Sequence, residues 1–596
     1  MSNTTNHRIA ALRSAMAKHG IAAYLIPSAD PHGSEFLPAH YTACTWLSGF
    51  TGESATLAVT QTGSALWVDG RFFEQGEQQL SGTEVTLMRK GEPGVPTPEA
   101  YLAGALATGG VLGFDGHCVS QSLAQRLQAA LQPAGAHLQS IDLISALWGS
   151  ERPPLPHSEC WLLNEESAGM DIAGKLTAAR GLLADAGADI LAESRLDCVA
   201  WLLNLRALDI ECTPYALAFC LLSQGECRLY IDASRMPAAV QATLCAAGVT
   251  LHPYDDFYPD CAALSGGTVL YDPASANYDL CRCLSDNANI TPLPQADPLL
   301  APKGIRNAGE LAATRQAHLY DGAAMVRFWM QLERCMAGGE SLTEMDIDAM
   351  LHRCRSAQPG FVVESFPTIA AWGPNASVIH YQPQPGHCSY LEPLGLLLVD
   401  SGATYRTGTT DITRTFAMGP LTQQEIQCCT LVLQSHIELA RAVWPSRCTA
   451  GELDVMARQP LWQHCLDFRH GTGHGVAHVG MVHEGPQSIR PQNPVVLKPG
   501  MVLTDEPGLY EPGRVGVRIE NELEVLEAGQ SDYGRFLRFM PLTWVPYDLQ
   551  CIDLSQLTAA QKSWLNWYHA QTAQRLAPLL SAEENRWLAE KTQPIA

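Results

Sequence analysis

The N-terminal half of the chain carries one sequence pattern twice, and this internal repeat constrains the fold more than any other feature. Each copy runs with helix-like apolar spacing to a glycine, Gly20 or Gly187, and continues into a strand-like segment, IAAYLIPS or ADILAES. A tryptophan segment and two strand-like segments that end in aspartate follow in each copy. These aspartates are Asp69 and Asp115 in the first copy and Asp232 and Asp272 in the second. Because repeated alternation of helix-like and strand-like patterns is typical of α/β layers, we expect two related α/β domains.

A proline-rich segment separates the two copies. The sequence GSERPPLPHSE at 149–159 has three prolines within five residues, which disfavours regular structure. A length of 596 residues is enough for three or four domains. We therefore divide the chain into α/β domain I (1–150), α/β domain II (151–305), a third domain (306–540) and a C-terminal extension (541–596).

The third domain has a different arrangement of predicted elements. Residues 310–334 have apolar side chains spaced by threes and fours, which predicts a long helix that ends at Gly338-Gly339. Two capping boxes, Ser341–Glu344 and Thr422–Glu425, predict two further helix starts. Strand-like segments lie between and after these helices rather than alternating with them, so we expect an α+β domain.

The C-terminal extension contains a capping box at Thr558–Gln561, followed by a helix with several aromatic residues, among them Trp564 and Tyr568. Aromatic side chains in such number need a partner surface. We expect the extension to dock on the third domain or on a second subunit.

Composition excludes several classes of function. The chain has 61 acidic and 38 basic residues, a formal net charge of −23, which disfavours binding to nucleic acid or to an anionic membrane. Apolar stretches such as 396–399 are far shorter than the about 18–20 residues of a membrane span. The N-terminal segment lacks the unbroken apolar core of a signal peptide. We therefore expect a cytoplasmic protein whose 19 cysteines are reduced thiols.

Four carboxylates and one histidine of the third domain lie where the surrounding pattern indicates burial. Asp400 ends the apolar run LGLLLV, and Asp411 follows on the return strand of a predicted hairpin. Glu506 stands between VLTD and Pro-Gly, Glu520 lies within VRIENELEV, and His474 lies in the glycine-rich run HGTGHG. These five residues are the candidate ligands of a metal site.

Buried carboxylates explain why this set points to metal ions. An unpaired buried carboxylate costs several kcal/mol, and four close together repel one another. Bound cations remove both penalties. Four oxygen donors and one imidazole suit two divalent ions bridged by carboxylates and a water, with Mn(II), Co(II), Fe(II) or Zn(II) all compatible. The lack of thiolate ligands argues against a structural zinc.

Each residue also has a simpler interpretation when it is taken alone. Asp400 or Asp411 suits a turn residue that hydrogen-bonds its own backbone. Glu520 suits a cross-strand ion pair with Arg518 or Arg514. The metal-site prediction therefore depends on the set and its order. The three glycines around His470 and His474 make a shared helix face there unfavourable, so the two histidines need not have the same role.

The order of these motifs resembles a known superfamily. DSGATYRTGTTDITRT (400–415), HGTGHGV (470–476), VHEGP (482–486), TDEPGLY (504–510) and RIENELEV (518–525) are similar to the metal-site signatures of the "pita-bread" metallopeptidases, which include methionine aminopeptidase, prolidase and aminopeptidase P. The similarity is strongest to the long, three-domain cytosolic form of aminopeptidase P and covers nearly the whole chain. It implies a pita-bread α+β catalytic domain preceded by two related creatinase N-terminal-like α/β domains.

The resemblance also implies the metal ligands and their roles. Asp400 and Asp411 would hold one ion, His474 and Glu506 the second, and Asp411 and Glu520 would bridge the two. Glu506 would in addition accept a proton from the bridging water and act as general base. The cofactor that the resemblance implies is a pair of divalent ions, with manganese(II) as the expected metal.

The same resemblance implies a set of substrate-contacting side chains. His483 would donate to the developing oxyanion, His380 would lie near the proline nitrogen, and His470 would line the site. Arg518 would orient Glu520 or pair with the substrate, and Tyr510 would line a proline pocket. Taken alone, His380 and His483 also suit half-buried structural histidines. His478 matches no position of the family, and we expect it at the surface.

The implied activity is removal of the first residue from peptides that have proline second. An Xaa-Pro bond has no N–H and a fixed φ, so an apolar slot can select the ring by shape. Two alternatives stay open: a prolidase that cuts Xaa-Pro dipeptides, and a non-catalytic peptide-binding module with the same fold. The resemblance also implies a homodimer.

Overall fold

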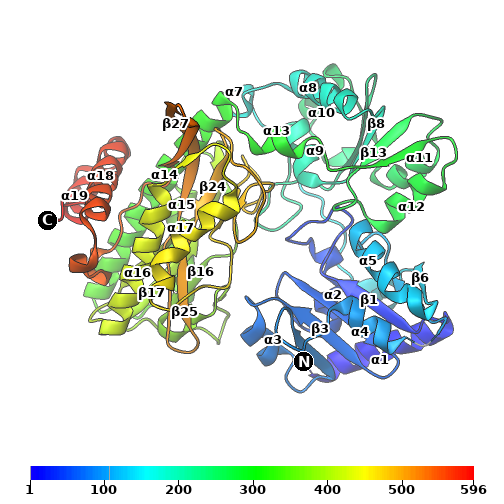
Figure 1. The fold of residues 1–596 in the computed structure, drawn as a ribbon, viewed down its shortest axis with the longest axis horizontal. Coiled ribbons are helices and arrows are strands. Elements are labelled where there is room, and N and C mark those ends of the chain that lie inside the picture. The colour runs from blue at the N-terminus through cyan, green and yellow to red at the C-terminus, as the bar shows by residue number, and fades with distance from the viewer. Residues whose placement is uncertain (1, 107) are drawn as a thin grey trace. The chain divides into compact units, whose positions relative to one another are not determined.

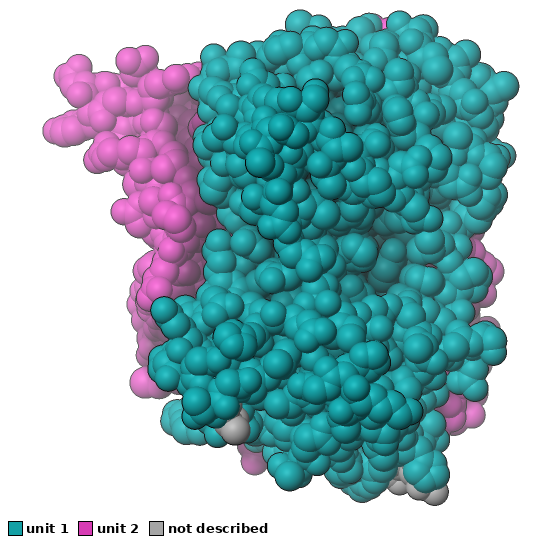
Figure 2. Space-filling view, turned by 90° about the vertical axis from the view of Figure 1, so that its right-hand side faces the viewer, with its two compact units in different colours: residues 1–162, 171–211, 215–299 teal, residues 163–170, 212–214, 300–596 magenta. Residues whose placement is uncertain are grey.

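The computed structural model of the protein describes residues 2–106 and 108–596 and is drawn in Figure 1. The chain forms two compact units, which are coloured separately in Figure 2. Unit 1 comprises Met1–Leu162, Asp171–Glu211 and Tyr215–Leu299, and unit 2 comprises Leu163–Met170, Cys212–Pro214 and Leu300–Ala596. Within the described residues, no helix combines the length and the apolar character needed to cross a bilayer.

Unit 1 contains two six-stranded mixed sheets with the same topology. The first has the order β4-β3-β2-β1-β5-β6 and the second the order β12-β11-β10-β8-β13-β14. The strands of the first are β1 (Ala23–Pro27), β2 (Ala55–Thr60), β3 (Ser64–Val68), β4 (Val85–Arg89), β5 (Val111–Phe114) and β6 (His137–Ser140). Those of the second are β8 (Ile190–Glu193), β10 (Phe219–Ser223), β11 (Cys227–Tyr230), β12 (Val249–His252), β13 (Thr268–Tyr271) and β14 (Thr291–Pro294).

The pairing of the strands confirms the predicted repeat. In each sheet the first strand pairs antiparallel with its neighbour on one side and parallel with its neighbour on the other. The outermost strand on each side is parallel to the strand that it contacts. Because strand order and strand direction both agree, the two halves of unit 1 have the same α/β topology. Residues 153–160 between them have no regular structure, as their prolines predict.

Helices cover the sheets of unit 1. In the first copy they are α1 (Ser2–Lys18), α2 (Ala43–Ser48), α3 (Phe73–Gln79), α4 (Pro98–Ala105), α5 (Gln121–Leu131) and α6 (Ile144–Trp148). In the second they are α8 (Ile172–Asp185), α9 (Leu196–Leu202), α10 (Ala238–Ala246), α11 (Phe257–Ala262) and α12 (Tyr278–Asp286). Along β1, Tyr24 and Ile26 belong to one apolar cluster and Ala23 and Leu25 to another. Since alternate residues of a strand face opposite sides, both faces of the first sheet are buried.

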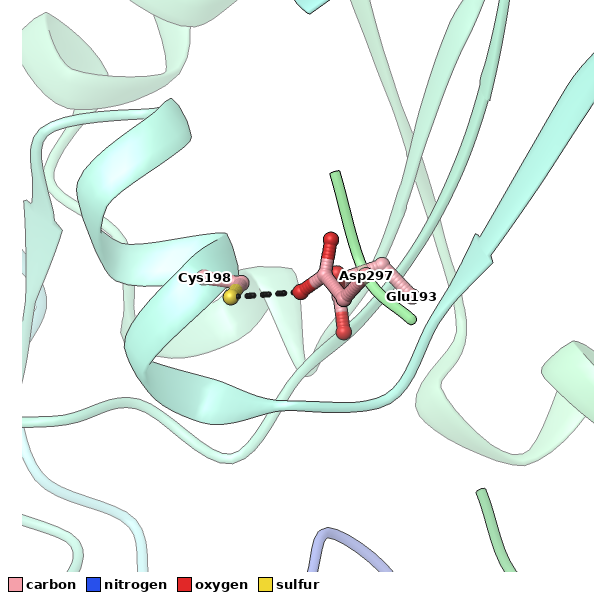
Figure 3. A group of neighbouring side chains, drawn as sticks. All are labelled: Glu193, Cys198 and Asp297. Atoms are coloured by element: carbon pink, nitrogen blue, oxygen red, sulfur yellow. Dashed lines mark hydrogen bonds between the residues drawn. The ribbon is translucent and has the colours of Figure 1, made fainter. Parts of the chain in front are cut away.

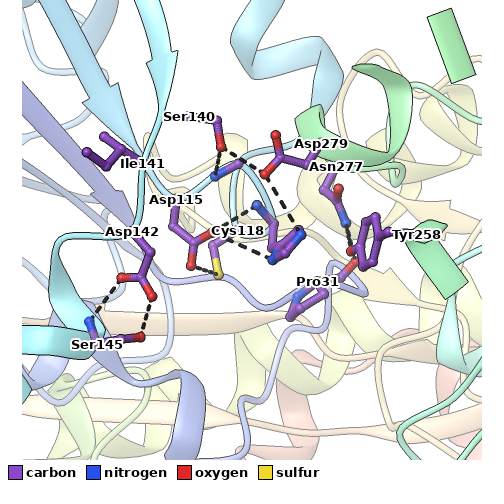
Figure 4. A network of polar contacts seen from close by, with 12 residues as sticks. Pro31, Asp115, Cys118, Ser140, Ile141, Asp142, Ser145, Tyr258, Asn277 and Asp279 are labelled. Atoms are coloured by element: carbon purple, nitrogen blue, oxygen red, sulfur yellow. Dashed lines mark hydrogen bonds and ion pairs between the residues drawn. The ribbon is translucent and has the colours of Figure 1, made fainter. Parts of the chain in front are cut away.

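Polar contacts join the two copies (Figure 4). The Ser140 hydroxyl donates to the Asp279 carboxylate (2.8 Å), and the side-chain amide of Asn277 donates to the Pro31 carbonyl (3.0 Å). Asp142 accepts hydrogen bonds from the backbone N–H groups of Ile144 and Ser145 and so closes the turn after β6. The two copies therefore belong to one compact unit, and the predicted boundary at residue 150 stays a prediction.

Unit 2 is an α+β domain in which helices surround short antiparallel sheets. The helices are α7 (Glu165–Ala168), α13 (Leu300–Gly304), α14 (Ala308–Ala337), α15 (Glu344–Ser356), α16 (Gln423–Ala440), α17 (Ala450–Trp462), α18 (Ala559–Leu576) and α19 (Ala582–Lys591). The strands that carry the site are β16 (Ile369–Trp372), β17 (Leu396–Ser401), β20 (Ile412–Ala417), β22 (Gly473–His474), β24 (Val502–Asp505), β25 (Gly508–Glu511), β26 (Val515–Arg518), β27 (Asn521–Ser531) and β28 (Gly534–Pro541). Two sheets have the orders β16-β17-β20 and β21-β28-β27-β24, where β21 is Val443–Pro445.

The C-terminal helices pack on the rest of unit 2. The side chains of Leu565, Tyr568 and Leu576 are fully buried in one apolar cluster with residues of α16. In Figure 1, α18 and α19 are coloured red and lie against α14. Tyr568 is therefore covered by the domain that precedes it in the chain, whereas Trp567 remains 38% exposed.

Helix starts test the predicted capping boxes. The boxes at Thr422–Glu425 and Thr558–Gln561 are confirmed, because α16 and α18 begin immediately after these threonines. The prediction at Ser341 is wrong: Thr343 caps α15 and forms the box with Asp346. Thr-x-x-Asp offers the same reciprocal hydrogen bonds as Ser-x-x-Glu, and Glu344 has other partners, described below.

Substitution of the capping residue tests this correction. We expect Thr343→Ala to lower the free energy of unfolding by about 1 kcal/mol, because the Asp346 N–H loses its acceptor. Ser341→Ala is the matched control and should change it by less than about 0.5 kcal/mol. Urea unfolding of the three proteins measures both values. A larger loss for Ser341→Ala than for Thr343→Ala would contradict the observed helix start.

Candidate metal centre and active site

Unit 2 brings the five candidate ligands together. Ligand atoms of Asp411, His474 and Glu520 all lie within 4.8 Å of one another. The Nε2 atom of His474 is 3.4 Å from Asp411 Oδ2 and 3.5 Å from Glu506 Oε1. The charge of Asp400 acts on the pKa values of Asp411, Glu506 and Glu520, so the fifth residue belongs to the same group. Residues spread over more than 100 positions of the chain therefore form one site.

Strand pairing places the carboxylates. In the β17–β20 ladder, Asp400 lies opposite Thr413, so the two side chains are on the same face of the sheet. Thr413 is the second residue after Asp411. The Glu520 N–H donates to the Thr413 carbonyl (3.1 Å), and the Thr413 hydroxyl donates to Glu520 Oε2 (2.7 Å). The turn that carries Glu520 is thereby attached to the strand that follows Asp411.

The glycine-rich run lets the backbone around His474 approach its neighbours. A Cβ atom at Gly473 would lie 1.9 Å from the Thr504 carbonyl oxygen, and one at Gly475 would lie 2.1 Å from the Glu484 carbonyl oxygen. Only glycine fits so close to another backbone. His474 lies in the short strand β22 and not in a helix, as the glycines predict.

Burial and mutual repulsion control the protonation of the carboxylates. Asp411 and Glu520 are 4% and 1% exposed. Burial, reinforced by the neighbouring acids, raises the pKa of both well above the usual range. Burial also raises the pKa of Glu506 to about 7, although His474 and Arg518 oppose the shift. Without cations, the site therefore retains protons on carboxyl groups that would be ionised in water.

Unsatisfied oxygens show that the site fits metal ions. Asp400 Oδ1 and Glu520 Oε1 are buried and have no hydrogen-bond partner in the described part of the chain. Buried polar atoms are nearly always paired, so these two oxygens of one site are available to a bound cation. Carboxylate oxygens with one imidazole nitrogen are suitable donors for divalent Mn, Co, Fe or Zn.

Arg518 holds Asp400 rather than Glu520. Its Nε and Nη2 atoms donate to Asp400 Oδ2 at 3.0 and 2.6 Å. Arg514 pairs with Glu511, so the predicted alternative of an ion pair between Glu520 and either arginine is wrong. Of the two predicted roles of Arg518, orientation of Glu520 is corrected, because the guanidinium is engaged by Asp400. Pairing of Arg518 with the substrate stays a prediction.

Tyr510 connects Arg518 to His470. The phenol oxygen accepts a hydrogen bond from Arg518 Nη1 (2.7 Å) and lies 3.0 Å from His470 Nε2. Burial, together with the charge of Arg518, lowers the pKa of His470 to about 3. His470 is therefore a neutral imidazole at physiological pH.

Two further histidines lie at the site. The ring of His483 is perpendicular to that of His474, with a centroid separation of 4.3 Å, and its charge acts on the pKa of Asp411. His380 follows Ile379, whose carbonyl accepts from Arg518 (3.4 Å), and its charge acts on the pKa of His470. All ten predicted site residues therefore lie in one neighbourhood of unit 2.

Glu344 is a structural residue of the site that the sequence did not reveal. The carboxylate is fully buried and accepts four hydrogen bonds: from the backbone N–H of Trp372 and of Ser389 (both 2.7 Å), from the Asn375 amide (2.8 Å) and from the Tyr381 hydroxyl (2.7 Å). Glu344 thus fixes both ends of the segment that carries His380. The sequence around Glu344 has the pattern of a capping box, so it did not indicate that this carboxylate is buried.

The prediction that His478 lies at the surface is wrong. The side chain is only 8% exposed, its Nε2 atom is 2.7 Å from the Ser167 carbonyl oxygen, and its Nδ1 atom is 3.2 Å from the Thr314 hydroxyl. Both partners are far away in the sequence. No local pattern around residue 478 could have predicted them.

A second acidic group lies in unit 1 (Figure 3). It consists of Glu193, Cys198 and Asp297, and the Cys198 thiol donates to Asp297 Oδ2 at 2.9 Å. Burial and the neighbouring Asp297 raise the pKa of Glu193 well above its usual range. A protonated Glu193 beside Asp297 accounts for this geometry. The group contains no imidazole, unlike the candidate metal centre of unit 2.

Comparison with known proteins identifies the family. Aminopeptidase P2 of Arabidopsis thaliana is 38% identical to the chain over 97% of this chain and 86% of its own length. The chain belongs to the aminopeptidase P family. Residues 312–527 match metallopeptidase family M24, 535–595 match the C-terminal region of peptidase M24, and 8–146 and 151–310 each match a creatinase/prolidase N-terminal domain. The predicted family and a metallo-aminopeptidase function are confirmed.

Solved structures agree with this assignment. An X-prolyl aminopeptidase from Caenorhabditis elegans, described as a cytosolic enzyme with a dinuclear active site, has a TM-score of 0.94 and 33% identity. The match covers 99% of this chain and all of that chain. A Xaa-Pro dipeptidase from Bacillus anthracis (TM-score 0.51, 20% identity, 63% of this chain and 99% of that chain) shares the fold. The predicted pita-bread domain with two creatinase-like domains is confirmed.

The raised carboxyl pKa values predict that metal binding stabilises the folded protein more at high pH than at low pH. The folded, metal-free site keeps protons that the unfolded chain releases above about pH 4.3, so the free energy of unfolding falls as pH rises toward about 7, the pKa of Glu506. Divalent ions replace these protons. We expect Mn²⁺ to raise the Tm more at about pH 8 than at about pH 5.5, measured by calorimetry on metal-free protein. Equal gains at both pH values would contradict these protonation states.

Proposed function

We propose that the enzyme removes the N-terminal residue from peptides that have proline in the second position. The observation that carries the proposal is the convergence of Asp400, Asp411, His474, Glu506 and Glu520, with buried oxygens that lack partners. Two divalent ions held by these side chains would supply Lewis acidity and a hydroxide nucleophile at neutral pH. Manganese is the metal that we propose, by family resemblance.

The five ligands have different tasks in this proposal. Asp400, Asp411, His474 and Glu520 would hold the two ions. Glu506 would also help to hold them and would accept a proton from the attacking water. Arg518 holds one oxygen of Asp400, which leaves the other for the metal.

The remaining site residues bind substrate. His483, beside His474, donates to the carbonyl oxygen of the bond that is cut, and His380 contacts the substrate near the proline nitrogen. Neutral His470 and Tyr510 form a partly apolar wall suited to a pyrrolidine ring. Because an Xaa-Pro bond has no N–H, a site that selects by shape accepts it where one that anchors an N–H does not.

Substrate length separates this proposal from a prolidase activity. A dipeptidase would hydrolyse Xaa-Pro and reject longer peptides, whereas the proposed aminopeptidase hydrolyses an Xaa-Pro-Pro tripeptide as well. Similarity along the full chain to an X-prolyl aminopeptidase favours the second activity, since the dipeptidase match covers only 63% of the chain. The presence of every ligand type argues against a purely peptide-binding module.

A cytoplasmic location and a homodimer complete the proposal. The C. elegans relative is described as cytosolic, and the net charge of −23 suits neither nucleic acid nor an anionic membrane as a partner. Family resemblance supports the dimer. Light scattering at micromolar concentration tests it, and a monomer would contradict it.

Removal of the proposed base should abolish activity. We expect Glu506→Gln to reduce kcat on Xaa-Pro-Pro by at least about 10⁴-fold, because one metal donor and the proton acceptor are both lost. Arg514→Gln, a substitution of an exposed ion pair with Glu511, is the control and should keep normal kcat. Near-normal turnover of Glu506→Gln would show that Glu506 is not the base.

His483 should contribute to turnover without holding metal. We expect His483→Ala to reduce kcat by about 10²–10³, the effect of one lost oxyanion donor, with two ions still bound per chain. Metal analysis after gel filtration and steady-state kinetics give the two values. Loss of an ion in this variant would make His483 a ligand instead.

A further inference from the structure

Arg414 is a fully buried guanidinium whose role the metal site alone does not explain. The side chain is 1% exposed and projects from β20, one residue after Thr413. Its Nη1 atom donates to the carbonyl oxygens of Thr413 (2.8 Å) and Glu520 (2.6 Å). Arg414 therefore ties together the two backbone segments that carry the Thr413 hydroxyl and the Glu520 carboxylate.

The other end of the same guanidinium contacts the segment after residue 540. Its Nη2 atom donates to the Val545 carbonyl (2.7 Å), to the Asn521 amide oxygen (2.8 Å) and to the Tyr568 hydroxyl (3.1 Å). The Tyr547 ring lies 4.5 Å from the guanidinium carbon. These partners are neutral, so the directions of their hydrogen bonds, and not an opposite charge, orient the buried guanidinium.

Tyr568 satisfies the C-terminal side of this network. The residue is fully buried on α18, and its hydroxyl accepts from Arg414 and from the Val545 N–H (3.1 Å). The single O–H can donate to the Thr543 carbonyl (2.9 Å). All the hydrogen-bonding capacity of one phenol is therefore used to hold Arg414 and residues 543–545 in one arrangement.

The network leads directly to a proposed metal ligand. Thr413 donates its hydroxyl to Glu520 Oε2 and accepts the Glu520 N–H at its carbonyl, the same carbonyl that Arg414 contacts. Glu520 Oε1 is left for the metal. Any shift of Arg414 would move the Thr413–Glu520 pair and the direction of that oxygen.

We propose that Arg414 and Tyr568 are positioning residues through which the C-terminal extension fixes the direction of the Glu520 carboxylate. The inference rests on the proposed function, since it treats Glu520 as a metal ligand. It assigns the extension a task in metal binding in addition to covering apolar surface. Neither residue contacts substrate in this assignment.

Two conservative substitutions test the proposal. Tyr568→Phe removes only the hydroxyl, and Arg414→Lys keeps the charge but cannot span both sets of carbonyls from one nitrogen. We expect each variant to bind Mn²⁺ about 10–100-fold more weakly, the usual effect of losing a group that orients a ligand, and to lower kcat at subsaturating Mn²⁺ with little change in KM. Tyr230→Phe is the matched control, because Tyr230 is equally buried and donates to Asp260 in unit 1. It should bind Mn²⁺ as the wild type does.

The double variant adds a test of the shared hydrogen bond. If Arg414 and Tyr568 act through one network, the loss of Mn²⁺ affinity in Arg414→Lys/Tyr568→Phe will be smaller than the product of the two single losses. Circular dichroism and Tm show whether each variant is folded. Should Arg414→Lys fail to fold, Tyr568→Phe decides the question alone.

The outcomes separate this inference from the proposed function. Wild-type Mn²⁺ affinity and kcat in folded Tyr568→Phe would overturn the inference and leave the proposed function intact. A wild-type enzyme that binds two ions but hydrolyses no Xaa-Pro peptide would contradict the proposed function. The comparison of Mn²⁺ affinities between variants would still decide the role of Arg414 and Tyr568.

Discussion

Repulsion among buried carboxylates is the constraint on which the catalytic unit depends. Asp400, Asp411, Glu506 and Glu520 lie close together, and burial with the charges of the neighbouring acids raises the pKa of Asp411, Glu506 and Glu520. These side chains have no tendency of their own to come together, because the free energy of an ionised carboxylate is lower in water than in the protein interior. The hydrogen bonds of the strand ladders hold the carboxylates close together in spite of this repulsion. Bound cations would relieve the repulsion, and the free energy so gained would contribute to metal affinity. The strength of the metal site and the instability of the empty site therefore have the same origin.

The neighbouring side chains divide the remaining work by charge. Arg518 supplies one positive charge to Asp400, whereas His470 is kept neutral by burial and by that same guanidinium. Glu344, also buried, accepts four hydrogen bonds and holds the segment of His380 in place. Oriented donors thus take over the role that water has at an exposed site. A precise site results from many neutral contacts around a few charges.

Part of this arrangement could be predicted because its signals are local. Glycine, the capping residues and the apolar periodicity each act over a few residues, and the repeat of unit 1, the helix starts at Thr422 and Thr558 and the non-helical HGTGHG run followed from them. The prediction at Ser341 was wrong because two possible capping boxes, Ser341–Glu344 and Thr343–Asp346, overlap in the sequence. Which of them forms depends on the other contacts of Glu344. His478 was misplaced because its partners, Ser167 and Thr314, are far away in the chain.

The sequence by itself determined the chemistry that is available: which residues carry carboxylates and imidazoles, in which order, and in which apolar surroundings. The tertiary structure alone decided their relations, such as the choice of Asp400 rather than Glu520 as the partner of Arg518, and the path from Tyr568 through Arg414 to Glu520. The physical reason is that periodicity and turn propensity act between near neighbours in the chain. Hydrogen bonds and charge pairs are chosen among all groups that folding brings within a few ångströms, whatever their separation in sequence.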